Sequence, residues 1–333
     1  MTAPSAPPIQ REYDALTKAV ALVDRSAVGR LSITGDDALD LIDRLSTNAL
    51  QGLEAGHGER TVLTSNKGRV VDVLFVLRLV DSLLVLTGPD NQEKVSEWID
   101  FYTIIEDVTP RDITGETAMF SLAGPGAPAT LRALMPAQTE PPDADEAISA
   151  VIGGVQATII RTDFIGAPAY DMMVADADGP QLRGTLVEAG AVPAGPDATE
   201  ALRVELGIPA FGKELGESYN PLEAGLLPVI SFTKGCYIGQ EVVARLNTYD
   251  KVQKRLVGLR WNGDSPPEPG ARLLLDGKQA GITTTVARSP RFAGVVGLGY
   301  VRKAHATPGT ELVLESPGGP TPVVVTALPF AAE

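Results

Sequence analysis

The sequence contains little sulfur, few imidazole side chains and few long apolar runs. Its 333 residues include one cysteine and two histidines. No internal disulfide can form, and the usual cysteine and histidine ligand sets for zinc cannot be assembled in one chain. An iron–sulfur cluster usually takes about four thiolates, and this chain could supply only one. The sequence therefore predicts no resident metal site.

Basic residues are also in deficit. Lysine and arginine number 28 against 42 aspartates and glutamates, which gives a formal net charge of −14. This negative field repels phosphate backbones, so bulk nucleic-acid binding is not expected. No window approaches the roughly 18 apolar residues of a membrane span, and the N-terminus lacks an apolar segment followed by a cleavage site. We therefore expect a cytoplasmic protein without a membrane partner.

The chain is rich enough in apolar residues, at 44%, to bury more than one core. Apolar spacing predicts a helix over 12–26, a strand over 29–35 and a helix that starts at Asp36 and Asp37. Residues 60–88 read as three antiparallel strands that turn at 65–68 and near 81–82. Strands and helices then alternate without a regular parallel cycle, which favours an α+β fold.

The composition changes after residue 250. Short strands punctuated by glycine, proline and aspartate fill 251–333, and Asp276-Gly277-Lys278 is a hairpin signal. The sequence thus predicts an α+β core over 1–250 and a small all-β barrel or sandwich over 251–333. The acidic, proline-rich segment 135–147 is predicted to be an exposed connection.

The single cysteine lies in "KGCYIGQE", residues 234–241. Gly235 and Gly239 bracket Cys236 on a predicted turn, and a helix is expected to follow. A thiol near a helix N-terminus and a cation such as Lys234 is stabilised as the thiolate. Cys236 is therefore a candidate nucleophile or metal ligand. The alternative is a small buried side chain that serves only in packing.

This octapeptide resembles the signature of the YgfZ family of folate-binding proteins, Lys-Gly-Cys-aromatic-x-Gly-Gln-Glu, and all seven specified positions agree. "RVELGIPAFGKEL" and "NPLEAGL" resemble a segment that YgfZ proteins share with the aminomethyltransferase T-protein of glycine cleavage. "GRLSITGDDALDLIDRLSTNAL" and "TSNKGRVVDVLFV" resemble their N-terminal region. The resemblance implies intertwined ferredoxin-like subdomains that form a folate-binding core around a central opening, plus a C-terminal β-barrel.

The resemblance also implies tetrahydrofolate, or a one-carbon derivative of it, as the cofactor. Glu223 in "NPLEAGL" matches the carboxylate that accepts hydrogen bonds from the pterin edge, and Glu205 in "RVELG" is a second match. Glu205 could instead lie on a solvated helix face. Arg255 resembles the arginine that meets the carboxylates of the folate tail, with Lys254 adjacent. The alternative for Arg255 is an ordinary charged turn before a strand.

Asp72 in "GRVVD" aligns with the aspartate that the transferase places near the reactive nitrogen of folate, where a buried carboxylate could act as a base. An Asp72 that faced water at a strand end would have no such role.

Three functions follow from the resemblance. The first is a tetrahydrofolate-binding accessory protein, with a reactive Cys236, that supports assembly or repair of iron–sulfur proteins and has them or their assembly factors as partners. The second is an aminomethyltransferase-like enzyme that uses Asp72. The third is a folate-binding module without chemistry.

Overall fold

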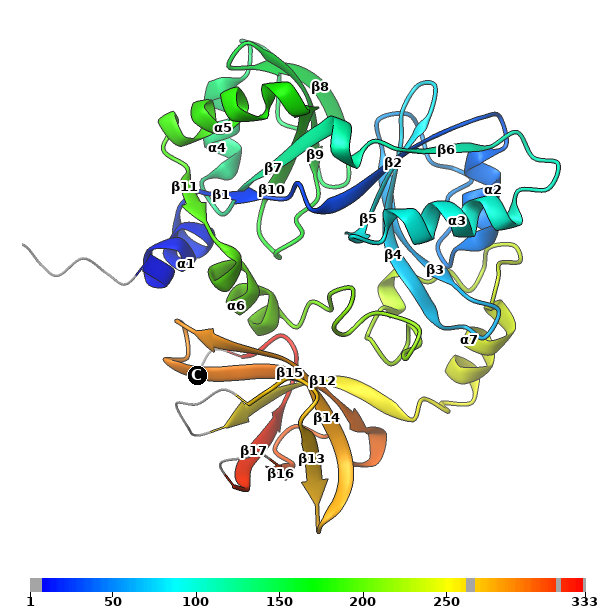
Figure 1. Cartoon of the computed structure of the whole chain (residues 1–333), viewed down its shortest axis with the longest axis vertical. Coiled ribbons are helices and arrows are strands. Elements are labelled where there is room, and N and C mark those ends of the chain that lie inside the picture. The colour runs from blue at the N-terminus through cyan, green and yellow to red at the C-terminus, as the bar shows by residue number, and fades with distance from the viewer. Residues whose placement is uncertain (1–7, 262–266, 316–318, 332–333) are drawn as a thin grey trace, which may run out of the picture. The chain divides into compact units, whose positions relative to one another are not determined.

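The computed structural model describes residues 8–261, 267–315 and 319–331 (Figure 1). The described residues form a mixed α+β core with two sheets, and a closed six-stranded β-barrel, so the predicted fold class is confirmed. They divide into two compact units. The first unit takes residues 8–63, 72–199 and 229–237, and the second takes 64–71, 200–228 and the described residues from 238 onward.

A six-stranded sheet in the first unit has the order β11-β1-β7-β10-β9-β8. Its pairs are antiparallel except for β1 with β11. Helices α4 and α5 pack on one face of this sheet and bury Leu131, Leu182 and Leu186 against it. The strands and helices are β1 (Ala21–Asp24), β7 (Thr117–Ala123), α4 (Ala127–Leu134), β8 (Ala147–Ile152), β9 (Val155–Arg161), β10 (Ala169–Ala175), α5 (Gly179–Glu188) and β11 (Val192–Ala194).

A five-stranded sheet has the order β3-β4-β5-β2-β6. The three strands predicted within 60–88 are confirmed as β3, β4 and β5, with turns at the expected positions. Its elements are β2 (Val28–Thr34), α2 (Ala38–Leu45), β3 (Gly58–Thr64), β4 (Val70–Arg78), β5 (Leu83–Pro89), α3 (Gln92–Tyr102) and β6 (Thr109–Asp112). The described residues also form four short 3₁₀ turns: η1 (Thr114–Glu116), η2 (Asp176–Asp178), η3 (Leu227–Val229) and η4 (Lys303–His305).

The two sheets are interleaved along the chain, because β1 belongs to the six-stranded sheet, β2–β6 to the five-stranded sheet and β7–β11 to the six-stranded sheet again. The helix predicted over 12–26 is wrong in its second half. Helix α1 (Pro8–Lys18) ends early, and Ala21–Asp24 forms β1 between β7 and β11. Four residues are too few for a periodicity that separates a strand from a helix. Pairing of β1 with the neighbouring strands therefore decides that this segment is a strand.

The second unit contains most of helix α6, helix α7 and the barrel, whose order is β12-β15-β14-β13-β16-β17. Asp276 and Gly277 both have positive φ, 50° and 73°, which confirms the predicted hairpin turn. The elements are α6 (Pro196–Leu206), α7 (Gln240–Thr248), β12 (Lys254–Trp261), β13 (Arg272–Leu275), β14 (Lys278–Ser289), β15 (Gly294–Arg302), β16 (Glu311–Leu314) and β17 (Thr321–Thr326). The domain boundary at residue 250 stays a prediction.

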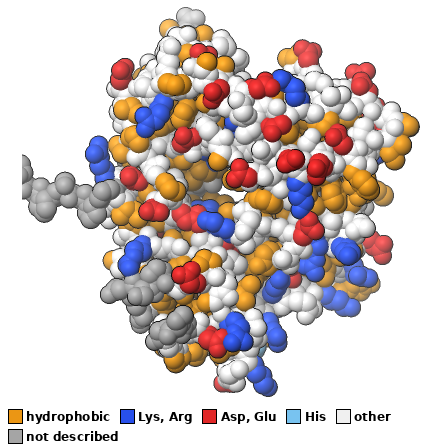
Figure 2. Space-filling model, viewed as in Figure 1, with side chains coloured by type: hydrophobic (Ala, Val, Ile, Leu, Met, Phe, Trp, Pro, Cys, Tyr) orange, Lys and Arg blue, Asp and Glu red, His pale blue; other side chains and the backbone are white. Residues whose placement is uncertain are grey.

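Among the described residues, no helix is both long enough and apolar enough to cross a membrane. On the face in Figure 2, acidic side chains lie among basic and hydrophobic ones, in keeping with the acidic composition.

Candidate functional site

Glu223 lies in a tight turn that its own motif builds. The backbone N–H of Asn220 donates to Glu223 Oε2 at 3.1 Å, and the backbone N–H of Glu223 donates to Asn220 Oδ1 at 3.0 Å. This reciprocal pattern is a capping box formed by the Asn-Pro-Leu-Glu sequence. Glu223 is only 5% exposed. Among the described residues, none donates a hydrogen bond to its second oxygen, Oε1.

Aromatic and basic side chains surround this carboxylate. The Tyr219 and Tyr300 rings stack with centroids 3.9 Å apart, and the Lys254 ammonium lies 4.3 Å from the Tyr219 centroid. Arg69 NH1 lies 3.7 Å from Glu223 Oε2. All of these residues belong to the second unit. The cluster of Glu223, Asn220, Tyr219, Lys254 and Arg69 is called the Glu223 cluster below.

Burial controls the electrostatics of the Glu223 cluster. Burial raises the pKa of Glu223, although the Asn220 N–H and the charges of Lys254 and Arg69 oppose the rise. Burial lowers the pKa of Lys254, against the attraction of Glu223. Both groups are therefore less stabilised in their charged forms here than in water. A ligand that donates hydrogen bonds to Glu223 would replace the hydrogen bonds to water that the carboxylate loses on burial.

Of the two adjacent basic residues at the start of β12, Lys254 is the one that faces Glu223. Arg255 is 55% exposed in its side chain, and its nearest acid is Asp250 at 3.9 Å. Successive side chains of a strand point to opposite faces, so Arg255 points away from the face that carries Lys254. The role of Arg255 in binding a folate tail stays a prediction, and its contacts fit the alternative of a charged strand start.

Glu205 is fully buried on α6, so the alternative of a solvated helix face is wrong. Ser289 Oγ donates to Glu205 Oε1 at 2.6 Å, and the backbone N–H of Phe330 donates to the Glu205 carbonyl at 2.8 Å. These contacts tie α6 to the barrel. A contact of Glu205 with folate stays a prediction.

Asp72 on β4 is 1% exposed, so the alternative of a water-facing strand end is wrong. Its carboxylate accepts from the backbone N–H of Val73 at 2.7 Å, the backbone N–H of Gly88 at 2.9 Å and Asn91 Nδ2 at 2.9 Å. Burial raises its pKa to about 6, because these three donors and the charge of Lys94 only partly offset the loss of water. The carboxyl group can therefore exchange a proton close to neutral pH.

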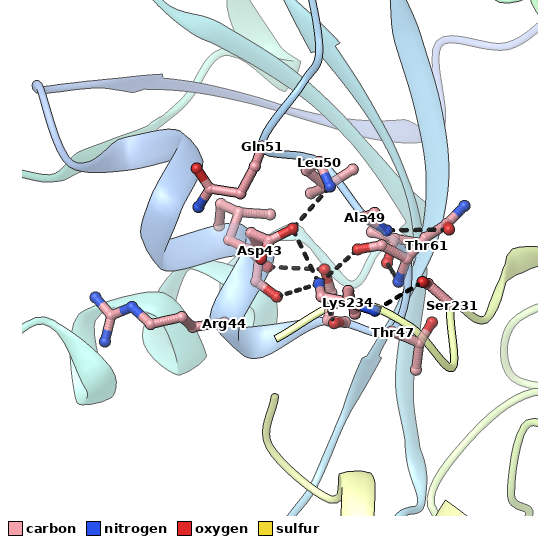
Figure 3. Close-up of polar contacts among 12 residues, drawn as sticks. Asp43, Arg44, Thr47, Ala49, Leu50, Gln51, Thr61, Ser231 and Lys234 are labelled. Carbon is pink, nitrogen blue, oxygen red and sulfur yellow. Dashed lines mark hydrogen bonds and ion pairs between the residues drawn. The ribbon is translucent and has the colours of Figure 1, made fainter. Parts of the chain in front are cut away.

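Lys234 binds the end of helix α2 (Figure 3). Its Nζ donates to the carbonyl oxygens of Asp43, Ser46 and Asn48 at 2.7, 3.0 and 2.6 Å, and lies 3.0 Å from Asp43 Oδ1. A cation at this position satisfies carbonyls that a helix C-terminus leaves without partners. The Lys234 side chain is 3% exposed. Its three N–H groups are thus engaged, and none is left for the thiol of Cys236.

Cys236 is exposed, so the packing alternative for this thiol is wrong. The next residue, Tyr237, is buried, and the Lys234 ammonium lies 5.7 Å from its ring centroid. Burial raises the pKa of the Tyr237 hydroxyl to about 12. Lys234 and Tyr237 therefore anchor the segment, and Cys236 between them faces outward. Helix α7 begins at Gln240 as predicted, after Gly239 with φ of +83°.

The structure distributes the predicted site residues over both units. Asp72, Lys234 and Cys236 lie in the first unit, and Glu205, Glu223 and Arg255 lie in the second. No role was predicted from the sequence for Tyr219, Asn220, Arg69 or Asp43. The Asn-x-x-Glu spacing of a capping box was a readable signal for Asn220, whereas the other three depend on tertiary contacts. Among the described residues, no group of three or more His, Cys, Asp or Glu side chains could hold a metal ion.

Comparisons with known proteins agree with this architecture. The GCVT N-terminal domain model matches residues 2–234, and the glycine cleavage T-protein C-terminal barrel domain model matches residues 254–331. The chain is 32% identical over 322 residues to "Putative transferase At1g60990, chloroplastic" of Arabidopsis thaliana, covering 96% of this chain and 73% of the relative. It is 30% identical over 332 residues to the aminomethyltransferase of Halalkalibacterium halodurans, covering 97% and 89%.

Among solved structures, the glycine cleavage system aminomethyltransferase T of Bartonella henselae matches with a TM-score of 0.87 at 20% identity, covering 97% of this chain and 90% of that chain. At this identity the match shows the shared fold.

Proposed function

We propose, from the premise that this chain belongs to the glycine cleavage T-protein family, that it binds a reduced folate and takes part in transfer of a one-carbon unit to it. The single observation that carries the proposal is the Glu223 cluster. It offers a buried carboxylate with one oxygen that no described residue uses, beside a tyrosine ring and two cations.

The donor and acceptor set of the Glu223 cluster fits a pterin. A pterin edge presents a ring N–H next to an amino group, and a carboxylate can accept both. The capping box fixes the Glu223 side chain, so little entropy is lost on binding. The folate would supply the nitrogen that accepts the one-carbon unit. Glu223 would orient the ring, and Tyr219 and Lys254 would line its surroundings.

Asp72 is the residue proposed to carry the proton chemistry. Three donors hold its carboxylate in one orientation, and a pKa of about 6 lets it both take and release a proton near neutral pH. A fixed negative charge at this position would also stabilise positive charge that develops on a nearby nitrogen. Asp72 is therefore assigned to the transfer step, and Glu223 to binding.

Binding is tested by calorimetric titration of tetrahydrofolate into the wild type and the Glu223→Gln variant. Glutamine keeps the shape and removes the charge, so we expect about a 10- to 100-fold rise in Kd. Glu217→Gln, at an exposed neighbour in the chain, is the matched control and should bind like the wild type. Equal affinities in all three proteins would reject the assignment of Glu223.

Transfer is tested separately with Asp72→Asn in an aminomethyl-transfer assay with saturating tetrahydrofolate. The variant should bind folate and lose turnover. Loss of binding together with turnover would contradict the separate roles of Asp72 and Glu223.

A second candidate, the YgfZ-like accessory function, is favoured by one observation, the exposed Cys236 within "KGCYIGQE". In this function the protein binds tetrahydrofolate and supports assembly or repair of iron–sulfur proteins, and any cluster would need thiolates from a partner because the chain has one cysteine. Cys236→Ala and Asp72→Asn discriminate the candidates. Reduced activity of cluster enzymes in cells with Cys236→Ala alone supports the accessory function, and lost transfer with Asp72→Asn alone supports the enzyme.

A further inference from the structure

A second polar cluster lies in the first unit, on the face of the six-stranded sheet opposite to α4 and α5. It consists of Arg25, just after β1, with Ser121 on β7 and Asp171 on β10. Ser121 is the register partner of both Val23 and Asp171. Side chains of directly opposed residues share a face, so Ser121 and Asp171 point the same way. Neither residue has a part in the function proposed above.

This cluster collects buried polar atoms that lack partners. Seven buried side-chain nitrogens and oxygens of the described residues have no hydrogen-bond partner, and three of them are Arg25 Nε, Ser121 Oγ and Asp171 Oδ1. Arg25 Nε lies 3.3 Å from Asp171 Oδ1, which is an ion pair without a well-formed hydrogen bond. Such atoms are costly when nothing completes their hydrogen bonds. Arg25 Nε and Asp171 Oδ1 partly satisfy each other, and the cluster as a whole is a place where a bound group could add hydrogen bonds.

The outer edge of Arg25 has the geometry for that group. Its guanidinium carbon lies 3.8 Å from the centroid of the Phe164 ring, so the planar group is supported on one side. The side chain is 15% exposed. No described residue accepts a hydrogen bond from its two terminal nitrogens. A planar fork of donors that is held in place and open at its edge suits a carboxylate, which can accept two parallel hydrogen bonds.

A second arginine strengthens the positive field. The charge of Arg60 acts on Arg25, while Arg60 itself pairs with the half-buried Asp145 and donates to the Thr162 carbonyl. Asp171 is the only fully buried carboxylate in this group, and it also accepts from Thr162 Oγ1 at 3.0 Å. Asp171 offsets part of the Arg25 charge through the ion pair at Nε, whereas the two terminal nitrogens of Arg25 contact no anion among the described residues.

We propose that Arg25 is a carboxylate-binding subsite, oriented by Asp171 and Phe164 and supported by the charge of Arg60. The carboxylate belongs either to the tail of the folate or to a separate carboxylate substrate. The first source rests on the function proposed above, and the second does not.

The test compares Arg25→Gln and Arg25→Lys with the wild type. Lysine keeps the charge and removes the planar fork, which guards against misfolding as the cause of any loss. Arg161→Gln is the matched control, because Arg161 is the register partner of Tyr170, one residue from Asp171, and so lies on the opposite face of the same sheet. Melting temperatures establish that each variant is folded.

Calorimetry then measures three ligands: tetrahydrofolate, a tetrahydropterin that lacks the tail, and glycine added to protein saturated with that tetrahydropterin. A Kd for tetrahydrofolate raised about 10-fold or more by both Arg25 substitutions, with tetrahydropterin unchanged, assigns the subsite to the folate tail. The same loss for glycine alone assigns it to a separate carboxylate substrate.

Two results would overturn the subsite: equal losses for tetrahydrofolate and tetrahydropterin, or no loss with any ligand in folded Arg25 variants. Failure of the wild type to bind either pterin ligand would instead reject the proposed folate function. In that case glycine is titrated into the protein without the pterin. The subsite is also rejected if glycine does not bind measurably, or if the Arg25 substitutions leave its Kd unchanged.

Discussion

Replacing Asp72 by asparagine should change how stability depends on pH. Burial disfavours the ionised form of this carboxyl group, so ionisation destabilises the folded wild type. Its pKa rises from 3.8 to about 6 on folding. A raised pKa means that the folded state holds the proton more tightly than the unfolded state. The contribution of protonated Asp72 to the stability of the folded wild type is therefore fully present below about pH 4, and it is lost as the pH rises through about 6. The difference corresponds to about 3 kcal/mol.

The asparagine variant cannot titrate at this position, so its free energy of unfolding should rise by about 2–3 kcal/mol relative to the wild type between pH 4 and pH 7. A constant offset of about 1–3 kcal/mol against the variant is expected at all pH values. Asparagine has one carbonyl oxygen, whereas the two oxygens of Asp72 accept three hydrogen bonds. The pH-dependent part of the difference is therefore the informative quantity.

The assay is urea unfolding at half-unit steps of pH, followed by tryptophan fluorescence. The chain has two tryptophans, Trp98 in the first unit and Trp261 in the second. A Trp261→Phe background therefore reports on the unit that contains Asp72. Asp81→Asn, at an exposed turn, is the matched control. A flat difference for Asp72→Asn would refute the raised pKa, and a difference of opposite slope would show that the three donors outweigh burial.

Three further predictions concern the "KGCYIGQE" segment. Lys234→Met leaves Asp43 and three carbonyls without their cation and should cost about 3–5 kcal/mol of stability by chemical denaturation; a loss below about 1 kcal/mol would contradict the anchor. Cys236 should be alkylated in the native protein at a rate that low urea does not change, as mass spectrometry can follow, because the thiol is already exposed; protection until global unfolding would contradict this. Gly239→Ala should destabilise the protein more than Gly212→Ala. Both glycines have positive φ, but a Cβ at Gly239 would lie 2.4 Å from a backbone oxygen, whereas a Cβ at Gly212 meets nothing within 4 Å. The Gly212 change should cost about 1–2 kcal/mol, and equal losses would show that the close contact relaxes.

Local chemistry made much of the fold predictable from the sequence. The turns of the β3–β5 meander and the Asp276-Gly277 hairpin carry residues that accept the required backbone angles. Strand β1 was missed because its four residues continue an apolar pattern compatible with the preceding helix. Only its position between β7 and β11 decides its conformation.

The candidate site was predictable to the level of residue types, and less so to the level of contacts. The Asn220–Glu223 capping box follows from spacing within four residues. The choice between Lys254 and Arg255 depends on strand alternation. In β12, Val257, Leu259 and Trp261 face the barrel interior, so Lys254 falls on the outer face that carries Glu223. To choose Lys254 over Arg255, one must know which residues of β12 face the barrel interior, and the sequence of the two basic residues does not show this.

The positions of Lys234 and Cys236 show that proximity in sequence does not ensure contact between a cation and a thiol. Two residues apart in the chain, they were expected to interact, with the cation favouring the thiolate. In an irregular segment, however, side chains two positions apart need not share a direction. Three carbonyls at and just after the end of α2, together with Asp43 Oδ1, engage the Lys234 ammonium. The motif therefore separates two tasks: Lys234 and the buried Tyr237 fix the backbone, and Cys236 is presented between them. No N–H of Lys234 is left to hydrogen-bond the thiol, so a substitution at Lys234 should act on Cys236 mainly by releasing the segment that holds it.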